Sequence, residues 1–519
     1  MPERSPRPAA DRLRGASSRA AGTLRRGAAA RSGGDGGRPI LPIAAVLVLL
    51  IAIVLAFRSC GDDDASRPPA TTTTQSADAT TAAALDVLRP DPEARAGELT
   101  ERATRGFAHP LYRLTPGGPI VTAARVATYR PLIERIAKDG KENPDLLEAI
   151  VFLESAGRPD AMASDDVAAA SGFTQIVAET GTNLLDMKID LKRSRQLTRL
   201  IRLGGRKQAA REAERRRVDP RFDPAEALKA TVRYLEFARG ELGGRRDLAV
   251  ASYHMGVGNL QRVLNAYGKG NVPFVRLFFG TDPQSTPQAA RILAGLEDDS
   301  QTYYWRVLAA QRIMRQFRRD PVRLARETEL QRRKASAEDL LHPPDETKAY
   351  ATPAELRTAQ QRSEVRALPK AAMRRNGLTI SSEMGELAAR LDQPRSRYRA
   401  LRPGALAGLL SIGAAVKELN RGRGRLTVTS TVRDERYQAR LGSENVQATA
   451  ARSQHTTGWA IDIGRRYSGS QATAFQWTLT RLQALNLIAW VREPTAIHLT
   501  FAPEAGKVFA PVLAKALGG

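Results

Sequence analysis

The stretch from Ser453 to Asp462 reads SQHTTGWAID and places a histidine and an aspartate seven residues apart. His455 precedes a Thr-Thr-Gly sequence typical of a turn, and WAIDI has the apolar, partly β-branched composition of a short strand. Because side chains alternate along a strand, Asp462 is expected on the face opposite Trp459. An aspartate on a strand and a histidine on the loop before it can bind one divalent metal ion. A catalytic zinc site needs a third protein ligand and an open position for water.

The third ligand is expected in the last strand of the chain. Only two of the five histidines lie beyond residue 342, His455 and His498, and His498 lies in the strand-like segment AIHLTF. With Asp462 they form a His-Asp-His set. A single histidine on a strand is usually a surface or core residue, but two at ordered positions with an aspartate are less often accidental. The sole cysteine, Cys60, excludes a thiolate metal site and an intrachain disulfide.

Residues 370–519 are expected to form an α+β domain with a small sheet. GALAGLLSIGAAVKELNR and TAFQWTLTRLQALN predict helices, and RLTVTSTVR predicts a strand that leads into Arg433. This region resembles the zinc D,D-peptidases of bacterial cell walls, the family of D-alanyl-D-alanine carboxypeptidases and dipeptidases. The family's block Ser-x-His-x-x-Gly-x-Ala-x-Asp is complete, VTSTVR precedes it, and a histidine on the terminal strand follows it. The resemblance covers about residues 410–501.

Three residues bind Zn²⁺ according to this resemblance: His455, Asp462 and His498. It also assigns Ser453 and Arg433 to the substrate, with Arg433 holding a carbonyl or carboxylate by charge-assisted hydrogen bonds. The family places a glutamate, the general base, a few residues before its last histidine. Glu493 is the only acid in WVREPTAIHL, although it lies farther from the histidine than is usual in the family.

Residues 89–319 are helix-patterned throughout and are expected to form an all-α domain. PDLLEAIVFLESAG has apolar residues at helical spacing, and the helix is expected to end at Gly157, with Pro159 beyond it. Glu154 lies on its last apolar turn. A glutamate at the end of a buried helix has a raised pKa, as a general acid for glycosidic bonds requires. The alternative is an amphipathic helix that ends with a solvated glutamate.

This region resembles the goose-lysozyme-like lytic transglycosylases, the SLT domain. Three blocks occur in the family's order: Glu154-Ser155, GFTQ at residues 172–175 and SYHMGVGN at residues 252–259. TYYWRVL, from Thr302, resembles a later tyrosine block, and the resemblance covers about residues 132–314. It implies several substrate-binding residues in the sugar cleft: Ser155, Gly172, Gln175, Tyr253, Asn259, Tyr303 and Tyr304.

The resemblance also implies that Glu154 protonates the glycosidic oxygen and then takes a proton from the sugar's own 6-hydroxyl. The product is a 1,6-anhydro-muramoyl end, and no cofactor is needed. A two-carboxylate lysozyme would need a partner for Glu154, and Asp165 and Asp166 in the following loop leave hydrolysis open. The chain departs from the family at His254, where asparagine is usual, and in a longer gap between Glu154 and Gln175.

Residues 40–57 carry no charge, and 18 helical residues span about 27 Å, close to the hydrocarbon thickness of a bilayer. Nine arginines precede this run, so the positive-inside rule predicts a membrane helix with a cytoplasmic N-terminus. A cleaved signal peptide is the alternative. The expected organisation is a cytoplasmic tail at 1–39, a transmembrane helix at 40–57, a disordered stalk at 58–88, the two extracytoplasmic domains at 89–319 and 370–519, each with its own core, and a partly helical linker at 320–369.

The formal net charge of +25 favours an anionic partner. Zinc-finger spacing and aromatic RNA-binding motifs are absent from the sequence, which makes nucleic acid a weak prediction. The sequence therefore predicts a membrane-anchored enzyme that cleaves peptidoglycan at its glycan strand and at D-alanine-containing peptides, as a carboxypeptidase or an endopeptidase. The alternatives are a wall-binding or scaffold protein with one or both sites inactive, and a muramidase that serves a secretion or conjugation machine.

Overall fold

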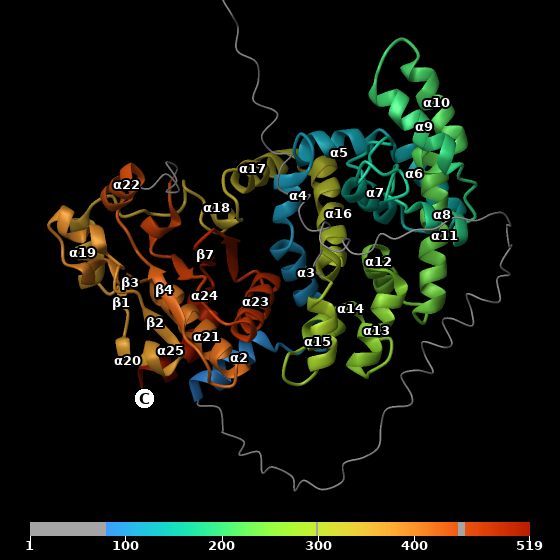
Figure 1. Cartoon of the computed structure of the whole chain (residues 1–519). Coiled ribbons are helices and arrows are strands. Elements are labelled where there is room, and N and C mark those ends of the chain that lie inside the picture. Colours follow the sequence, from blue (N-terminus) through green and yellow to red (C-terminus); the bar gives the residue numbers. More distant parts are fainter. Residues whose placement is uncertain (1–78, 297–298, 445–451, 519) are drawn as a thin grey trace, which may run out of the picture. The chain divides into compact units, whose positions relative to one another are not determined.

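The computed structural model describes residues 79–296, 299–444 and 452–518 of the chain (Figure 1). The expected tail at 1–39, the expected membrane helix at 40–57 and most of the expected stalk lie outside these residues. Within the described ranges, none of the helices is long and apolar enough to cross a membrane. The expected fold class therefore has to be corrected: the observed fold has a helical part and a part that contains a sheet, without a membrane-spanning helix among its described elements.

The helical part runs from α3 to α16. Its helices are α3 (Ala96–Gly106), α4 (His109–Leu114), α5 (Pro119–Ala127), α6 (Arg130–Asp139), α7 (Pro144–Glu154), α8 (Ala178–Asn183), α9 (Leu191–Arg202), α10 (Gln208–Val218), α11 (Pro224–Glu241), α12 (Arg246–Met255), α13 (Val257–Tyr267), α14 (Phe274–Gly280), α15 (Pro287–Ala294) and α16 (Tyr303–Arg319). The buried helix α7 packs against α16, and α9 and α10 lie side by side (Figure 1). Asn143 and Asp223 cap α7 and α11 by accepting hydrogen bonds from free backbone N–H groups of the first turn.

The second part contains a five-stranded sheet with the strand order β2-β4-β5-β7-β6. Its strands are β2 (Leu378–Ile380), β4 (Leu426–Ser430), β5 (Ala460–Gly464), β6 (Ile488–Arg492) and β7 (Ala496–Phe501). Only β2 and β4 are parallel; the other neighbours are antiparallel. The register pairs Asp462 on β5 with Ser430 on β4 and with His498 on β7. Three sequence-predicted strands correspond to β4, β5 and β7.

Two further strands, β1 (Arg366–Ala367) and β3 (Ala400–Leu401), form a separate two-stranded sheet. Helix α21 contacts β7 and α23, and both helices were expected from the sequence. The helices of this part are α20 (Lys370–Arg375), α21 (Pro403–Leu419), α22 (Glu435–Glu444), α23 (Gly469–Ala484), α24 (Ala505–Val508) and α25 (Ala510–Leu517).

The expectation of two separate cores is wrong, because one continuous hydrophobic cluster contains buried residues of both parts. Helix α3 packs directly on α23. At Gly106 the backbones are so close that a Cβ atom would lie 1.8 Å from the carbonyl oxygen of Gln483. Arg102 on α3 donates hydrogen bonds to the Leu485 carbonyl at 2.9 Å and to Glu504 at 2.6 Å.

The segments expected to be a stalk and a linker also contribute helices. The end of the expected stalk forms α2 (Ala79–Leu88), whose small side chains pack on α21 and α25. This corrects the prediction of disorder up to residue 88. Residues 320–369 contain α17 (Pro321–Arg332), α18 (Glu338–Leu341) and α19 (Pro353–Gln361), and α17 packs on α16 while α18 contacts β7.

Candidate active sites

Glu154 is the last residue of α7 and is partly buried against α16. Tyr303, the first residue of α16, is 3% exposed and donates its hydroxyl hydrogen to Glu154 Oε1 at 2.6 Å. Burial raises the pKa of Glu154 to about 7, although the hydrogen bond from Tyr303 and the charge of Arg306 act in the opposite direction. A carboxyl group with this pKa retains a large protonated fraction near neutral pH, which general acid catalysis requires.

Two aromatic side chains from the end of α12 flank this pair. The ring of Tyr253 is stacked near Tyr303 with centroids 6.3 Å apart, and the exposed ring of His254 stacks on Tyr303 at 5.2 Å. The Tyr253 hydroxyl donates to the carbonyl oxygen of Thr174 at 2.9 Å. The four sequence blocks, which are far apart in the chain, are therefore in contact around Glu154.

The loop of residues 172–175 is positioned by its backbone. Gly172 has φ +85°, and a Cβ atom there would lie 1.8 Å from the carbonyl oxygen of Arg221. The Gln175 amide donates to the carbonyls of Ala161 and Gly172 at 3.0 and 2.9 Å, so this side chain holds the loop together. Buried Arg221, which the sequence did not single out, also donates to carbonyls of this long loop, those of Val167, Ala169 and Ile176.

Other expected substrate-binding residues have structural contacts. Ser155 is buried, and its hydroxyl donates to the Val151 carbonyl at 3.3 Å. Asn259 donates to the Met255 carbonyl at 2.7 Å. Tyr304 packs against Phe274 and Trp305.

The two loop carboxylates that left hydrolysis open pair with arginines of α9. Asp165 is 97% exposed and forms an ion pair with Arg202 at 3.0 Å, and Asp166 pairs with Arg195 at 3.3 Å. The structure therefore does not bring either carboxylate into a pair with Glu154.

Residues 205–272 match the transglycosylase SLT domain family. The match confirms the expected lysozyme-like resemblance for this segment, which includes Tyr253 and the block at residues 252–259. Glu154 and Tyr303 lie outside the SLT match, and it is the fold that places them beside Tyr253. A search of curated proteins found no match to the chain. The SLT-matched segment ends before the sheet-containing part begins, so it does not include His455, Asp462 or His498.

The side chains of His455, Asp462 and His498 converge, with one potential ligand atom from each lying within 4.8 Å of the others. His455 belongs to the short 3-10 helix η5 (Gln454–Thr457) that precedes β5, and the strand register brings Asp462 opposite His498. The Asp462 carboxylate lies 3.2 Å from His455 Nε2 and 2.9 Å from His498 Nδ1.

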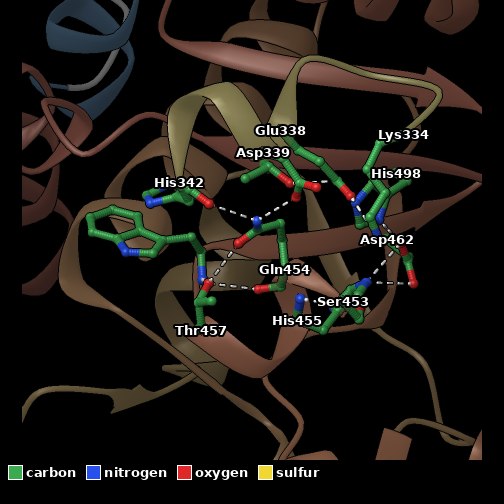
Figure 2. A network of polar contacts seen from close by, with 12 residues as sticks. Lys334, Glu338, Asp339, His342, Ser453, Gln454, His455, Thr457, Asp462 and His498 are labelled. Carbon is green, nitrogen blue, oxygen red and sulfur yellow. Dashed lines mark hydrogen bonds and ion pairs between the residues drawn. The ribbon is translucent and has the colours of Figure 1, made fainter. Parts of the chain in front are cut away.

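The remaining nitrogen of each imidazole faces a hydrogen-bond acceptor, and Figure 2 shows the one beside His498, Glu338. His455 Nδ1 lies 2.7 Å from the Thr431 carbonyl oxygen, and His498 Nε2 lies 2.7 Å from Glu338 Oε2. Hydrogens on these two nitrogens leave the lone pairs of His455 Nε2 and His498 Nδ1 directed at Asp462. Three electron-pair donors then face one another, an arrangement that fits a zinc ion, and such outer hydrogen bonds are usual for histidine ligands.

Protons can also neutralise the negative charge of this cluster. Burial alone would lower the pKa of His498, but the charges of Glu338 and Asp462 and their hydrogen bonds outweigh burial and raise it to about 10. For Asp462, burial opposes ionisation, but the two histidines hold its pKa well below its usual range. The site therefore attracts positive charge, whether a proton or a cation.

Two of the other expected residues, Arg433 and Ser453, contact this cluster. The Arg433 guanidinium donates to Ser430 Oγ at 2.7 Å and to Asp462 Oδ2 at 3.3 Å. Ser453 is buried, and its hydroxyl caps η5 through the His455 N–H group. Glu493 is exposed in the turn between β6 and β7. Loss of hydration raises the pKa of its carboxyl group, and the charge of Asp462 adds to this effect.

The contribution of α18 was missed by the sequence analysis. Besides Glu338, this short helix supplies Asp339, which accepts a hydrogen bond from the Gln454 amide at 2.9 Å (Figure 2). His342, just after α18, lies 2.7 Å from the carbonyl oxygen of Phe501. In the sequence, acidic residues at the start of a short helix look like solvated first-turn residues. Their burial is visible only in the fold.

Proposed function

We propose that this protein cleaves the glycan strand of peptidoglycan as a lytic transglycosylase, with Glu154 as its acid. The observation that carries the proposal is the position of Glu154 at the end of α7, where it accepts a hydrogen bond from Tyr303 at 2.6 Å. Burial there raises the pKa of Glu154 to about 7, against the opposing effect of that hydrogen bond. The SLT family match at residues 205–272 supports the same reaction class.

In the first step Glu154 gives its proton to the glycosidic oxygen as the bond to C1 breaks. The Tyr303 hydroxyl and the nearby charge of Arg306 stabilise the carboxylate that results. The carboxylate then takes the proton of the sugar's 6-hydroxyl while O6 bonds to C1, which closes the 1,6-anhydro ring without adding water. Tyr253 and His254 provide aromatic surface next to the reacting sugar.

The test is the product of purified peptidoglycan digested by the full chain. We expect anhydro-muropeptides from the wild type and from Asp165→Asn, which removes an exposed carboxylate. Glu154→Gln is nearly isosteric and cannot transfer the proton, so it should release none. Hydrolysed, non-anhydro ends as the main product would contradict the transglycosylase reaction, and activity retained by Glu154→Gln would contradict the assignment of the acid.

We also propose a second activity, a zinc-dependent cleavage of D-alanine-containing stem peptides in the sheet-containing part. The facing lone pairs of His455, Asp462 and His498 favour it. These three residues would hold the ion, which when bound supplies a Lewis acid for the peptide carbonyl. Arg433, 3.3 Å from Asp462, would orient a substrate carbonyl or carboxylate, and Glu493 would accept the proton of the attacking water.

Zinc content and D-alanine release from a pentapeptide muropeptide test this activity. His455→Ala should lose zinc and peptide cleavage. Glu493→Gln should keep one zinc per chain and lose most peptide cleavage, about 100- to 10,000-fold for removal of a general base. Loss of zinc in Glu493→Gln would make that glutamate a ligand, and a wild type that binds no zinc would leave this part a binding module.

A further inference from the structure

Helices α9 and α10 form a hairpin that carries a large share of the positive charge of the chain (Figure 1). Residues 191–218 contain eleven lysines and arginines and two glutamates. Both glutamates accept hydrogen bonds inside the hairpin, Glu214 from Arg193 at 2.7 Å and Glu212 from the Gln208 amide at 2.9 Å. The other basic side chains therefore have no acidic partner within the hairpin.

Four of these basic residues form a stripe along one face of α9. Their spacing of three, four and three residues places them on the same side of the helix, and all four are exposed: Lys192, Arg195, Arg199 and Arg202. Another side of α9 packs on α10, where Arg215 donates to the Thr198 hydroxyl at 3.3 Å. The stripe extends over about 15 Å, the rise of ten helical residues.

The stripe lies beside the loop that supports the Glu154 site. Arg202 pairs with Asp165 at 3.0 Å and Arg195 pairs with Asp166 at 3.3 Å, and both acids belong to the loop that continues to Gly172. These ion pairs are exposed, and exposed pairs contribute little to stability, so another anion can replace the two carboxylates.

The other two basic residues of the stripe are available to a ligand, because Lys192 and Arg199 form no ion pair with the described residues. A row of charges along a helix suits a linear ligand with repeated negative charges, whereas a small anion contacts only one or two of them. Arginine and lysine are both usual phosphate-binding residues.

A lipid surface fits the stripe less well. A membrane-binding helix presents a wide apolar face beside its basic residues. The stripe ends instead at one apolar residue with a large exposed surface, Leu203, which is 81% exposed. Charge and shape therefore favour a linear phosphate polymer.

We propose that the stripe on α9 binds a linear polyanion with phosphate groups along its length. The polymer lies along α9 and replaces Asp165 and Asp166 as the partners of Arg202 and Arg195. It then runs past the loop of the glycan site. Binding requires no cleavage, so this proposal is independent of both proposed activities.

The probe for the test is long-chain inorganic polyphosphate with a fluorescent end label, and the measurement is its anisotropy with the full chain at several salt concentrations. Lys192→Gln/Arg199→Gln removes the two unpaired charges of the stripe. Its Kd at low salt should be at least about tenfold higher than that of the wild type, the effect of one charge-assisted hydrogen bond. The slope of log K against log salt should also become smaller by about 1.4, because each phosphate contact of a single strand contributes about 0.7.

The matched control is Arg319→Gln/Lys507→Gln, which removes one exposed arginine of α16 and one exposed lysine of α24. It lowers the net charge of the chain by the same amount outside α9 and α10, and it should bind polyphosphate like the wild type. Asp165→Asn should act in the opposite direction from the stripe variant. It removes the 97% exposed carboxylate that competes for Arg202, so Kd should fall about two- to fivefold.

Vesicles of phosphatidylglycerol and phosphatidylcholine test the lipid surface, and Leu203→Ser removes the exposed leucine at the end of the stripe. The proposal is overturned if the wild type does not bind polyphosphate, or if the stripe variant binds it as tightly as the matched control. It is also overturned if Asp165→Asn does not tighten binding, or if the chain binds the vesicles more tightly than polyphosphate and loses this binding in Leu203→Ser.

Discussion

Replacing Tyr303 with phenylalanine isolates the contribution of one hydrogen bond to the acidity of Glu154. The Tyr303 hydroxyl lies 2.6 Å from Glu154 Oε1 and stabilises the ionised carboxylate, whereas burial raises its pKa to about 7. Phenylalanine keeps the buried ring between Tyr253 and His254 and removes only the donor. The carboxylate of the variant is therefore less stable, and the pKa of Glu154 should rise further.

The size of the shift follows from the strength of such bonds. A hydrogen bond to an ionised group contributes about 1.5–3 kcal/mol, and one pKa unit corresponds to about 1.4 kcal/mol. We therefore expect the pKa of Glu154 to rise by about one to two units, with part of the bond energy recovered by water at this partly exposed carboxylate.

The assay is the pH dependence of kcat/KM for release of anhydro-muropeptides. The acid must be protonated, so activity falls as pH rises through the pKa of Glu154. The alkaline limb should lie near pH 7 in the wild type and move to higher pH in Tyr303→Phe. Tyr304→Phe is the matched control, because Tyr304 packs on Phe274 and Trp305. A limb that stays in place or moves to lower pH in Tyr303→Phe would refute the reasoning.

Three further outcomes are expected. The folded-state pKa of Glu154 lies above its ordinary value of 4.5, so its contribution to stability is complete below pH 4.5 and is lost as pH rises through about 7. The free energy of unfolding of Glu154→Gln should therefore exceed that of the wild type by up to about 3 kcal/mol at pH 8. At pH 4 urea melts of the two proteins should give the same free energy of unfolding. Glu338→Gln should weaken zinc binding about 10- to 100-fold in chelator competition, because Glu338 orients His498. The exposed control Glu329→Gln should bind zinc like the wild type. Equal zinc affinities of Glu338→Gln and the wild type would show that Glu338 does not support the site. Gly106→Ala should destabilise the chain by about 1–3 kcal/mol, because its new Cβ meets the Gln483 carbonyl. Gly97→Ala in the same helix meets nothing within 4 Å and should be nearly neutral. Equal melting temperatures of the two variants would contradict the close contact.

Sequence patterns predicted residues whose spacing or rarity carries information. His455 and His498 could be paired before the fold was known because few histidines compete with them, and alternation in β5 directed Asp462 toward one face. Glu154 and Tyr253 followed from ordered blocks. Neighbours in sequence can have different contacts on a helix: Ser155 donates to the Val151 carbonyl and Tyr304 packs on Phe274 and Trp305, so their expected contacts with substrate stay predictions.

The remaining differences come from contacts between distant segments. The Ala- and Thr-rich composition of residues 79–88 is typical of disorder, yet small side chains allow α2 to pack closely on α21, a partner more than 300 residues away. Likewise, Glu338 is buried only because α17 follows α16 and leads α18 to β7. Local sequence does not encode which surface a short helix will meet.

The position of α18 also determines where the gene can be divided. A recombinant fragment that starts at residue 370 contains every sequence-predicted residue of the proposed zinc site. It lacks Glu338, Asp339 and His342, which bond to His498, Gln454 and the Phe501 carbonyl. It would also expose the surface of α23 that packs on α3. Low zinc affinity or poor solubility of such a fragment would reflect where the chain was cut and would say little about the activity of the intact protein.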